Sequence, residues 1–400
     1  MRLLEINSVV NFGSTGRIVS SLAKYLQYEG DEVLVCYGRG NSTASFPLYH
    51  IGHGNFNFYE AVLETRLFDN SGFASREPTK KLIKIIDKFQ PDIVHLHNLH
   101  GYYVNVEELF DYLSESNLKV VWTFHDIWPF SPHAAIMALN DFNVPSTIKH
   151  KSELSLYPKT WFINKKDHNY WRKRYVFTQL SPSNLYIVAP SKWMKNLIKN
   201  SFFKNYPIHV IYNGIDIVKF QNYLSLPLYV KHSGPKRVLG VASVWNENKG
   251  LSYLNQLSEV MGNNLNITLI GDTRHNYVNK LIHKVGIISD IAQLTNYYQS
   301  SDVFVNPTLA ETFGLTNVES LVCGTPVITF NSGGNSEMLN SNTGIVVQRG
   351  DFNGLLEAVK NIKKNEKISE LCQSQGFLFS EKRMDINYYN LYKKILSKSL

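Results

Sequence analysis

The chain alternates short apolar runs with amphipathic segments, and this alternation constrains its fold more than any other feature. The apolar runs have the length of buried strands, and the amphipathic segments carry apolar residues at the spacing of one helix face. Strands that alternate with helices form parallel sheets covered by helices. With 400 residues, the chain is long enough for two such domains.

The two halves of the chain each contain one such series. We expect a Rossmann-like α/β domain at 1–215, a linker at 216–235, a second Rossmann-like domain at 236–381 and a closing helix at 382–400. A doubly wound domain binds its ligand at the carboxyl ends of its strands, so the main site is expected in a cleft between the domains. Strands are expected at 2–6, 32–37, 92–96, 119–124, 185–189, 237–242, 266–270, 303–306, 326–330 and 345–347. Among the helices, one is expected at 16–29 and one that Ser191 caps and that runs to about residue 200, whereas residues 149–174 fit neither a strand nor a simple helix.

Composition excludes several classes of protein. A hydrophobic fraction of 44% and a charged fraction of 18% indicate a folded globular protein. Cys36, Cys323 and Cys372 lack the spacing of a disulfide framework or a zinc site. Arg2 and Glu5 interrupt the first apolar stretch, and no run is long enough for a membrane span. We therefore expect a cytoplasmic protein whose membrane contact, if any, is peripheral.

Basic residues are concentrated between residues 149 and 174. The chain carries a net charge of +8, and this segment has eight basic and two acidic residues, or +6. Aromatic residues lie among its cations, as in surfaces that contact anionic membranes. A solvated basic loop and a surface for single-stranded nucleic acid are the alternatives, and nothing matches a nucleic-acid module. The cations are Lys149, Lys151, Lys159, Lys165, Lys166, Arg172, Lys173 and Arg174.

The stretch from residue 303 to 337 is the most specific part of the sequence. It reads as a strand, a loop, a helix that starts near Leu315 and a second strand. Free amides at the start of that helix predict an anion site, which Gly314 leaves open to a phosphate. Glu319 lies one turn inside the helix, where it could bind a ribose diol, and Glu311 lies on the loop. The alternative is a capping loop with two solvated glutamates.

These residues resemble the family 4 retaining glycosyltransferases, which have the two-domain GT-B fold. The resemblance rests on the Glu311 and Glu319 pair, on Ser332-Gly333-Gly334 and on Lys249-Gly250 in the second half. In the first half it rests on Gly13-Ser14-Thr15-Gly16, His95-Leu96-His97-Asn98, Thr123-Phe124-His125-Asp126 and Tyr212-Asn213-Gly214-Ile215-Asp216.

The resemblance implies roles for individual residues. Glu311 would contact hydroxyls of the donor sugar, Glu319 would hold the ribose, and Lys249 would neutralise the diphosphate. His125 would line the donor-sugar pocket, and His125, Lys249 and Glu311 would form the catalytic set. The expected donor-binding residues are Gly13, Gly16, Asn213, Lys249, Gly271, Ile287, Phe313, Gly314, Leu315 and Glu319.

One departure from the family concerns the diphosphate. The family commonly has an Arg five or six residues before Lys249, whereas this chain has Ser243 and Val244. Arg274 is a possible substitute, although a solvated loop cation is the alternative. The sequence does not say which residue replaces the usual Arg.

Three histidines, His95, His97 and His100, precede His125 and raise the question of a metal site. His95 and His97 can share one face of a strand, but no carboxylate cluster adjoins them and GT-B enzymes generally need no metal. We therefore expect neither a metal nor a cofactor.

The predicted function is metal-independent, retaining transfer of a sugar from a UDP- or GDP-sugar. The acceptor would be a glycan or a polyprenyl-linked glycan in capsule, lipopolysaccharide or exopolysaccharide assembly. The alternatives are a nucleotide-sugar epimerase of the same fold and a non-catalytic membrane-binding or sugar-binding module. The donor base and sugar, the acceptor, the linkage and the oligomeric state are not predicted.

Overall fold

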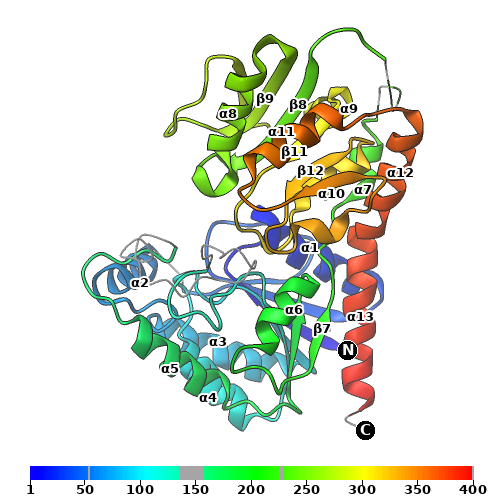
Figure 1. Cartoon of the computed structure of the whole chain (residues 1–400). Coiled ribbons are helices and arrows are strands. Elements are labelled where there is room, and N and C mark those ends of the chain that lie inside the picture. The colour runs from blue at the N-terminus through cyan, green and yellow to red at the C-terminus, as the bar shows by residue number, and fades with distance from the viewer. Residues whose placement is uncertain (53–54, 136–156, 225–226, 228, 230, 399–400) are drawn as a thin grey trace. The chain divides into compact units, whose positions relative to one another are not determined.

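A computed structural model describes the chain except at residues 53–54, 136–156, 225–226, 228, 230 and 399–400 (Figure 1). The described residues form two compact units. The first contains residues 1–135, 157–212 and 384–398, and the second contains residues from 213 to 383. The second unit begins at Asn213, and the chain returns to the first unit at Met384. The sequence placed the end of the first domain at 215, the start of the second at 236 and the start of the closing helix at 382.

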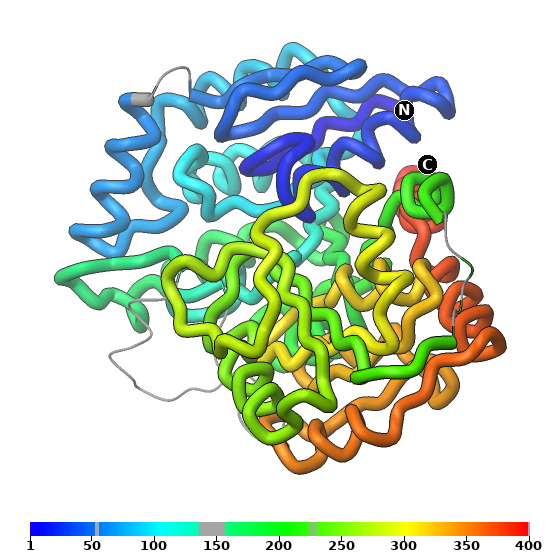
Figure 2. The backbone as a smooth tube through the Cα atoms, turned by 90° about the horizontal axis from the view of Figure 1, so that it is seen from above, coloured from blue at the N-terminus to red at the C-terminus, as the bar shows by residue number. Residues whose placement is uncertain are grey.

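The first unit is built on a parallel sheet whose described strands follow the order β3-β2-β1-β4-β5-β6-β7. This is the strand order of a Rossmann-like domain, with β1 at the point where the order reverses. Strands β1 and β2 pair in parallel and lie in the blue part of the tube in Figure 2. The strands are β1 (Arg2–Asn7), β2 (Glu32–Tyr37), β3 (Leu48–His50), β4 (Ile93–Leu96), β5 (Lys119–Thr123), β6 (Leu185–Ala189) and β7 (Ile208–Val210).

Helices cover both faces of this sheet because alternate residues of each strand point to opposite sides. Leu4 and Ile6 join one apolar core, whereas Leu3 joins the other, which also contains residues of the first and last helices. The C-terminal helix therefore packs on the first unit, as expected (Figure 1). The helices of this unit are α1 (Gly13–Tyr28), α2 (Asn55–Phe68), α3 (Arg76–Phe89), α4 (Val106–Glu115), α5 (Lys166–Phe177), α6 (Lys192–Lys199) and α13 (Glu381–Ser397).

The second unit repeats the architecture with the order β10-β9-β8-β11-β12-β13, again parallel. Its strands are β8 (Lys236–Val244), β9 (Leu265–Asp272), β10 (Ile282–Gly286), β11 (Val303–Asn306), β12 (Val327–Phe330) and β13 (Gly344–Val347). Its α-helices are α7 (Ile217–Gln221), α8 (Leu251–Met261), α9 (Ile291–Ser300), α10 (Leu315–Val322), α11 (Phe352–Asn361) and α12 (Glu366–Gly376). The predicted fold class, two doubly wound α/β domains, is confirmed.

Some elements differ from the sequence prediction. The helix expected from residue 16 begins at Gly13, and the basic segment, which we expected to form no simple helix, contains α5. Among the helices of the described residues, none combines the length and the hydropathy that a bilayer span requires.

Candidate functional site

The loop between β11 and α10 is held by buried amide side chains. Asn306, at the end of β11, donates from its amide to Asn317 in α10 at 2.8 Å. Asn317 in turn donates to the carbonyl oxygen of Asn335 at 3.2 Å. All three side chains are buried, and among the described residues the Oδ1 atom of Asn335 has no hydrogen-bond partner. Hydrogen bonds between buried polar groups fix the local structure. The start of α10 is therefore rigidly placed before any ligand binds.

Two glycines allow this loop to close on itself. A Cβ atom at Gly314, the N-cap of α10, would lie 2.3 Å from the Oδ1 atom of Asn335. Gly333 has a φ of +63°, and a Cβ there would lie 1.6 Å from the carbonyl oxygen of Glu311. Neither position accepts a side chain without moving backbone or buried groups. These glycines leave the backbone at the start of α10 without side-chain cover.

Glu311 and Lys249 form an ion pair on this loop. The Nζ atom of Lys249 lies 2.7 Å from the Oε2 atom of Glu311, and both side chains are partly exposed. Lys249 ends a short 3-10 helix, Glu247–Lys249, and the following Gly250 packs against the carbonyl of Pro307. The close approach of Gly250 to Pro307 therefore brings the predicted cation beside the predicted sugar-binding carboxylate.

Glu319 is oriented by a buried phenol. The hydroxyl of Tyr298, from α9, donates to the Oε2 atom of Glu319 at 2.9 Å. Burial raises the pKa of Tyr298 well above its usual value, and the Glu319 charge adds to the increase. The phenol therefore stays protonated and donates to Glu319. This hydrogen bond fixes the orientation of the Glu319 carboxylate.

The other predicted donor-binding residues of the second unit have varied environments. Phe313 is buried and its ring lies 6.0 Å from that of Phe379, so only its backbone could contact a ligand. The amide of Leu315 already donates to the carbonyl of Phe313 at 3.1 Å. Ile287 follows β10 and is 71% exposed, and Asn213 is buried with its amide oxygen lacking a hydrogen-bond partner.

The end of β9 carries the remaining predicted residues of this unit. Gly271 has a φ of +124° and packs against the carbonyl of Ala242, where a side chain would clash. The guanidinium of Arg274 folds back on Asp272, with its Nη2 atom 2.7 Å from the Oδ2 atom. Hydrogen bonds from Arg274 lower the pKa of Asp272 below its usual range. Arg274 is thus neutralised locally by its neighbour.

In the first unit, the loop of Gly13 and Gly16 forms the start of α1. Gly13 is exposed and has a φ of +65°. Gly16 is buried, and a Cβ there would lie 3.2 Å from the side chain of Val9. Gly16 therefore allows the first turn of α1 to lie close to the loop that follows β1, whereas Gly13 supplies the left-handed backbone at the start of the helix.

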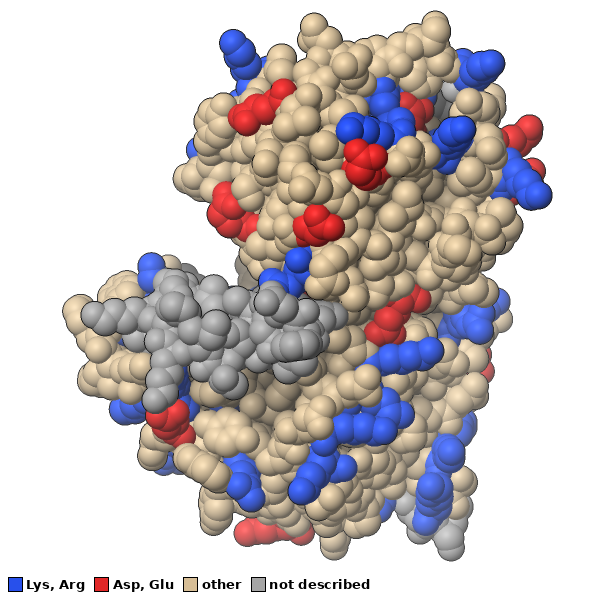
Figure 3. Space-filling view, in the orientation of Figure 1, with Lys and Arg blue, Asp and Glu red and all other residues tan. Residues whose placement is uncertain are grey.

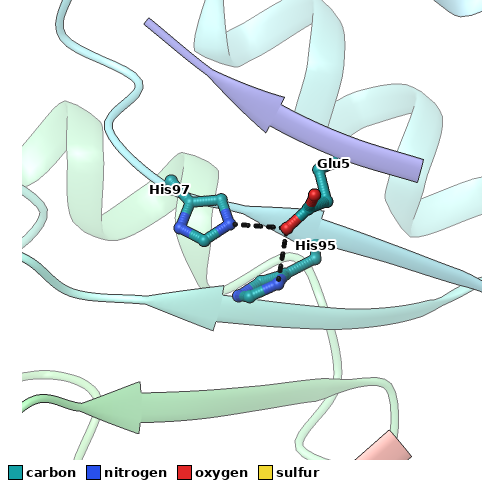
Figure 4. Close-up of side chains that lie close together, drawn as sticks. All are labelled: Glu5, His95 and His97. Atoms are coloured by element: carbon teal, nitrogen blue, oxygen red, sulfur yellow. Dashed lines mark hydrogen bonds and ion pairs between the residues drawn. The ribbon is translucent and has the colours of Figure 1, made fainter. Parts of the chain in front are cut away.

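His125 ends a chain of buried polar groups at the carboxyl edge of the same sheet. Its Nε2 atom lies 2.9 Å from the Nδ1 atom of His97, whose Nε2 atom lies 3.4 Å from the Oε1 atom of Glu5. Figure 4 shows Glu5, on β1, directed towards both His97 and His95. Glu5 pairs in register with His95 on the neighbouring β4. One carboxylate, Glu5, therefore adjoins these histidines, although the sequence predicted no carboxylate cluster beside them.

Burial shifts the pKa values of these buried polar groups. It raises the pKa of the Glu5 carboxyl well above the usual value, with Asp385 adding to the increase. It lowers the pKa of His97 well below the usual value and that of His125 to about 4. Both imidazoles are therefore uncharged at pH 7. Each neutral ring has one N–H donor and one acceptor nitrogen, so His97 and His125 can pass a hydrogen bond along the cluster from Glu5.

His95 connects the cluster to the C-terminal helix. Its Nδ1 atom lies 2.7 Å from the hydroxyl of Tyr392, and its Nε2 atom lies 2.8 Å from the hydroxyl of Thr123. Possible ligand atoms of Glu5, His95 and His97 lie within 4.8 Å of one another. Both nitrogens of His95 already have hydrogen-bond partners, so a cation would have to displace them. The geometry fits a hydrogen-bonded network better than a metal site.

Comparison with known proteins places the chain in a family. Residues 15–219 match the family described as Glycosyltransferase Family 4, and residues 235–365 match the group described as Glycosyl transferases group 1. The chain belongs to glycosyltransferase family 4. The predicted family and the predicted enzyme class are confirmed.

Two curated relatives have names that specify a process. The chain is 27% identical over 209 residues to the capsular polysaccharide biosynthesis glycosyltransferase CapM of Staphylococcus aureus, an alignment that covers 48% of this chain and 55% of CapM. It is 22% identical to the putative colanic acid biosynthesis glycosyl transferase WcaC of Escherichia coli, over 76% of this chain and 77% of WcaC.

Solved structures of glycosyltransferases share the fold. The sucrose-phosphate synthase of Thermosynechococcus elongatus matches with a TM-score of 0.71 and 14% identity over the whole of both chains. HepE of Anabaena, in complex with UDP, matches with a TM-score of 0.65 and 15% identity over 98% of this chain and 100% of HepE. The fold of this family member is therefore GT-B.

Two cations of the basic segment, residues 149–174, are not free surface charges. Lys173 is buried and donates to the carbonyl of Trp128 at 2.7 Å, and Arg172 pairs with Glu107. Lys149 and Lys151 lie outside the described residues. On the face drawn in Figure 3, lysine and arginine side chains are spread over the first unit and not gathered in one strip.

Sequence reasoning missed Glu5, Tyr298 and Tyr392 as parts of the site. A charged residue inside the first apolar run was a signal for Glu5, because acidic residues are seldom buried without a partner. Tyr298 and Tyr392 gave no signal, because their contacts depend on packing between elements distant in sequence.

Proposed function

We propose that this glycosyltransferase retains the anomeric configuration of a nucleotide-diphosphate sugar, needs no metal ion, and transfers the sugar to a glycan or lipid-linked acceptor in bacterial surface polysaccharide assembly. The observation that carries the proposal is the Lys249–Glu311 pair beside the start of α10, at 2.7 Å. A cation and a carboxylate placed together suit a diphosphate and a sugar that are joined to each other.

Each residue has a defined task in the proposed donor complex. The positive end of α10 and Lys249 stabilise the charge that grows on the leaving diphosphate. Glu311, released from Lys249 as the cation turns to the phosphates, accepts hydrogen bonds from sugar hydroxyls. Glu319, held by Tyr298, accepts hydrogen bonds from the ribose.

The proton of the acceptor hydroxyl goes to an oxygen of the leaving diphosphate in this mechanism. The acceptor hydroxyl attacks the anomeric carbon on the same face that the diphosphate leaves, so the configuration is retained. Glu311 is occupied by the sugar hydroxyls in this complex, which disfavours it as a free nucleophile. His125, neutral at pH 7 because burial lowers its pKa to about 4, serves as a hydrogen-bond donor to the sugar and not as a proton carrier.

The relatives support the proposed process and the choice of donor. CapM and WcaC are named for capsular and colanic acid polysaccharides, and HepE was solved with UDP. A UDP-sugar is therefore the first donor to test, with a GDP-sugar as the second.

A thermal-shift screen in EDTA tests donor recognition. We expect UDP or GDP to raise the melting temperature, since a ligand that binds only the folded chain stabilises it in proportion to its affinity. Glu319→Gln should reduce this shift, while the exposed Glu357→Gln serves as the matched control. An absence of any shift with every nucleoside diphosphate would contradict the proposal, and turnover of donor alone to an epimer would favour the epimerase.

A membrane partner is proposed for the first unit, at the inner face of the plasma membrane. The chain between residues 160 and 163 packs on α2 through a contact of Arg66 over the ring of Trp161 at 5.0 Å. Exposed aromatic rings on these segments and on α5 lie near exposed cations, a combination that binds anionic headgroups. The exposed apolar residues are Phe56, Tyr59, Leu63, Trp161, Phe162, Trp171 and Tyr175.

Sedimentation with vesicles tests the membrane proposal. A double variant, Trp161→Ser with Phe162→Ser, should bind phosphatidylglycerol vesicles less than the wild type, and added salt should weaken the binding of both. Tyr277→Ser is the control, because Tyr277 is an equally exposed aromatic residue of the second unit. Unchanged vesicle binding by the double variant would remove this partner.

A further inference from the structure

A cavity opens at the carboxyl edge of the first sheet, and none of the predicted site residues lines it. Its volume is about 440 Å³, which falls within the range of small-molecule sites. It is formed by the residues at and after the ends of β2 and β3, by the start of α2, by the start of α3 and by Tyr102 and Tyr103 after β4. Ligands of doubly wound domains bind at this edge of the sheet.

The cavity presents a cation without a counter-charge. Arg39 lies between two glycines on its wall, and its Nε atom is buried without a hydrogen-bond partner. Among the described residues that line the cavity there is no Asp or Glu. A guanidinium in such a place recognises an oxyanion, to which it can make charge-assisted and bidentate hydrogen bonds.

A second polar group and two strained residues lie on the same wall. The hydroxyl of Ser75, which precedes α3, is also buried without a partner. Ser75 has a φ of 64° and Tyr102 a φ of 65°, a region that residues other than glycine seldom adopt. Such backbone strain is found mostly at binding and active sites, where the surrounding structure maintains it.

Aromatic rings also line the cavity. Phe58 packs edge-on against Tyr102, with ring centroids 5.9 Å apart. Gly38 allows the ring of Tyr103 to lie directly on the backbone, since a Cβ there would be 2.1 Å from that ring. Rings suit the apolar face of a sugar, and α2 also carries exposed apolar residues, among them Leu63, next to those that line the cavity.

We propose that this cavity is a subsite for a glycosyl phosphate, the phosphate-bearing end of the acceptor, with Arg39 and Ser75 on the phosphate and Phe58 and Tyr102 against the sugar. The inference rests on the proposed transferase function. The phosphate could belong to a lipid-linked glycan or to a free sugar phosphate, and both present the same group to Arg39.

Titration of the full-length protein with three probes tests the subsite. We expect glucose 1-phosphate to bind about tenfold to a hundredfold more tightly than glucose, the gain typical of a charge-assisted hydrogen bond. Arg39→Gln should lose this preference, and Arg39→Lys should keep part of it. The third probe, the dodecyl phosphodiester of glucose 1-phosphate, separates the sources: tighter binding than glucose 1-phosphate assigns a lipid-linked acceptor, and equal binding a free sugar phosphate.

Arg76→Gln is the matched control, because Arg76 is the next residue after Ser75 but pairs with Glu107 and Glu108 and does not line the cavity. It should keep the wild-type preference. Binding of UDP is measured on every variant, because it shows whether the fold and the donor site are intact independently of the subsite. Equal affinity of the wild type for glucose and glucose 1-phosphate, or an unchanged preference in Arg39→Gln, would overturn the subsite. Failure of the wild type to bind any nucleoside diphosphate would instead contradict the proposed function.

Discussion

Acid should destabilise the first unit through His125, and the structure gives the size of the effect. Burial lowers the pKa of this imidazole from 6.5 to about 4. The unfolded chain therefore takes up a proton as the pH falls through 6.5, while the folded chain does so only near 4. The stability that His125 supplies is full above pH 6.5 and is lost on acidification. Between pH 7 and pH 5 the loss is about 2 kcal/mol.

Urea unfolding at the two pH values measures this loss. Tryptophan fluorescence reports chiefly on the first unit, because Trp245 alone among the six tryptophans lies outside it. His125→Gln should lose about 2 kcal/mol less than the wild type between pH 7 and pH 5. The exposed His168→Gln is the control and should behave as the wild type does. Equal losses in the wild type and in His125→Gln would refute the assignment of a neutral, buried imidazole.

Three further predictions concern the donor site and one buried cation. Lys249→Ala should lower kcat by about a hundredfold, measured as nucleoside diphosphate release, with little change in donor affinity, since the charge on the leaving group grows mainly in the transition state. Glu319→Gln should weaken UDP or GDP binding by about tenfold, and Tyr298→Phe by less, as measured by calorimetry. Burial lowers the pKa of Lys173 from 10.5 to about 7. Between pH 7 and pH 9 the folded Lys173 is losing its proton while the unfolded lysine keeps its own, and holding a proton becomes less favourable as the pH rises. The wild type should therefore gain about 2 kcal/mol of stability relative to Lys173→Met over this range, as measured by urea unfolding. An activity of Lys249→Ala equal to that of the wild type, UDP affinity unchanged in Glu319→Gln, or parallel pH curves for Lys173→Met would contradict the respective assignments.

Strands and helices whose patterns were regular could be predicted from the sequence. Strand β11 was placed within its observed bounds, and the cap of α6 at Ser191 was recognised from residue type alone, since its hydroxyl accepts from the amide of Met194. Strands β3, β7 and β10 were not predicted. β3 and β7 have only three residues each, and β10 has polar, exposed residues at its second and third positions. Helix α2 escaped because its apolar residues do not gather on one face, and several remain exposed.

Only part of the candidate site could be predicted from the sequence. Glu311, Glu319 and Lys249 stand in a local motif, so their loop and helix could be located from spacing. The contact between Glu5 and His97 depends on the register of two parallel strands separated by more than 80 residues in the sequence, and no local pattern encodes that register. The cavity around Arg39 depends on five separate segments, so composition and spacing could not reveal it.

The anomeric configuration of the first product tests the central claim most directly. The full-length protein is incubated in EDTA with α-linked UDP- or GDP-sugars, with water or a sugar phosphate as acceptor, and the product is followed by proton NMR before it can mutarotate. Retaining, metal-independent transfer predicts an α-configured product in EDTA. A β-configured product, or turnover that appears only when a divalent cation is restored, would contradict it.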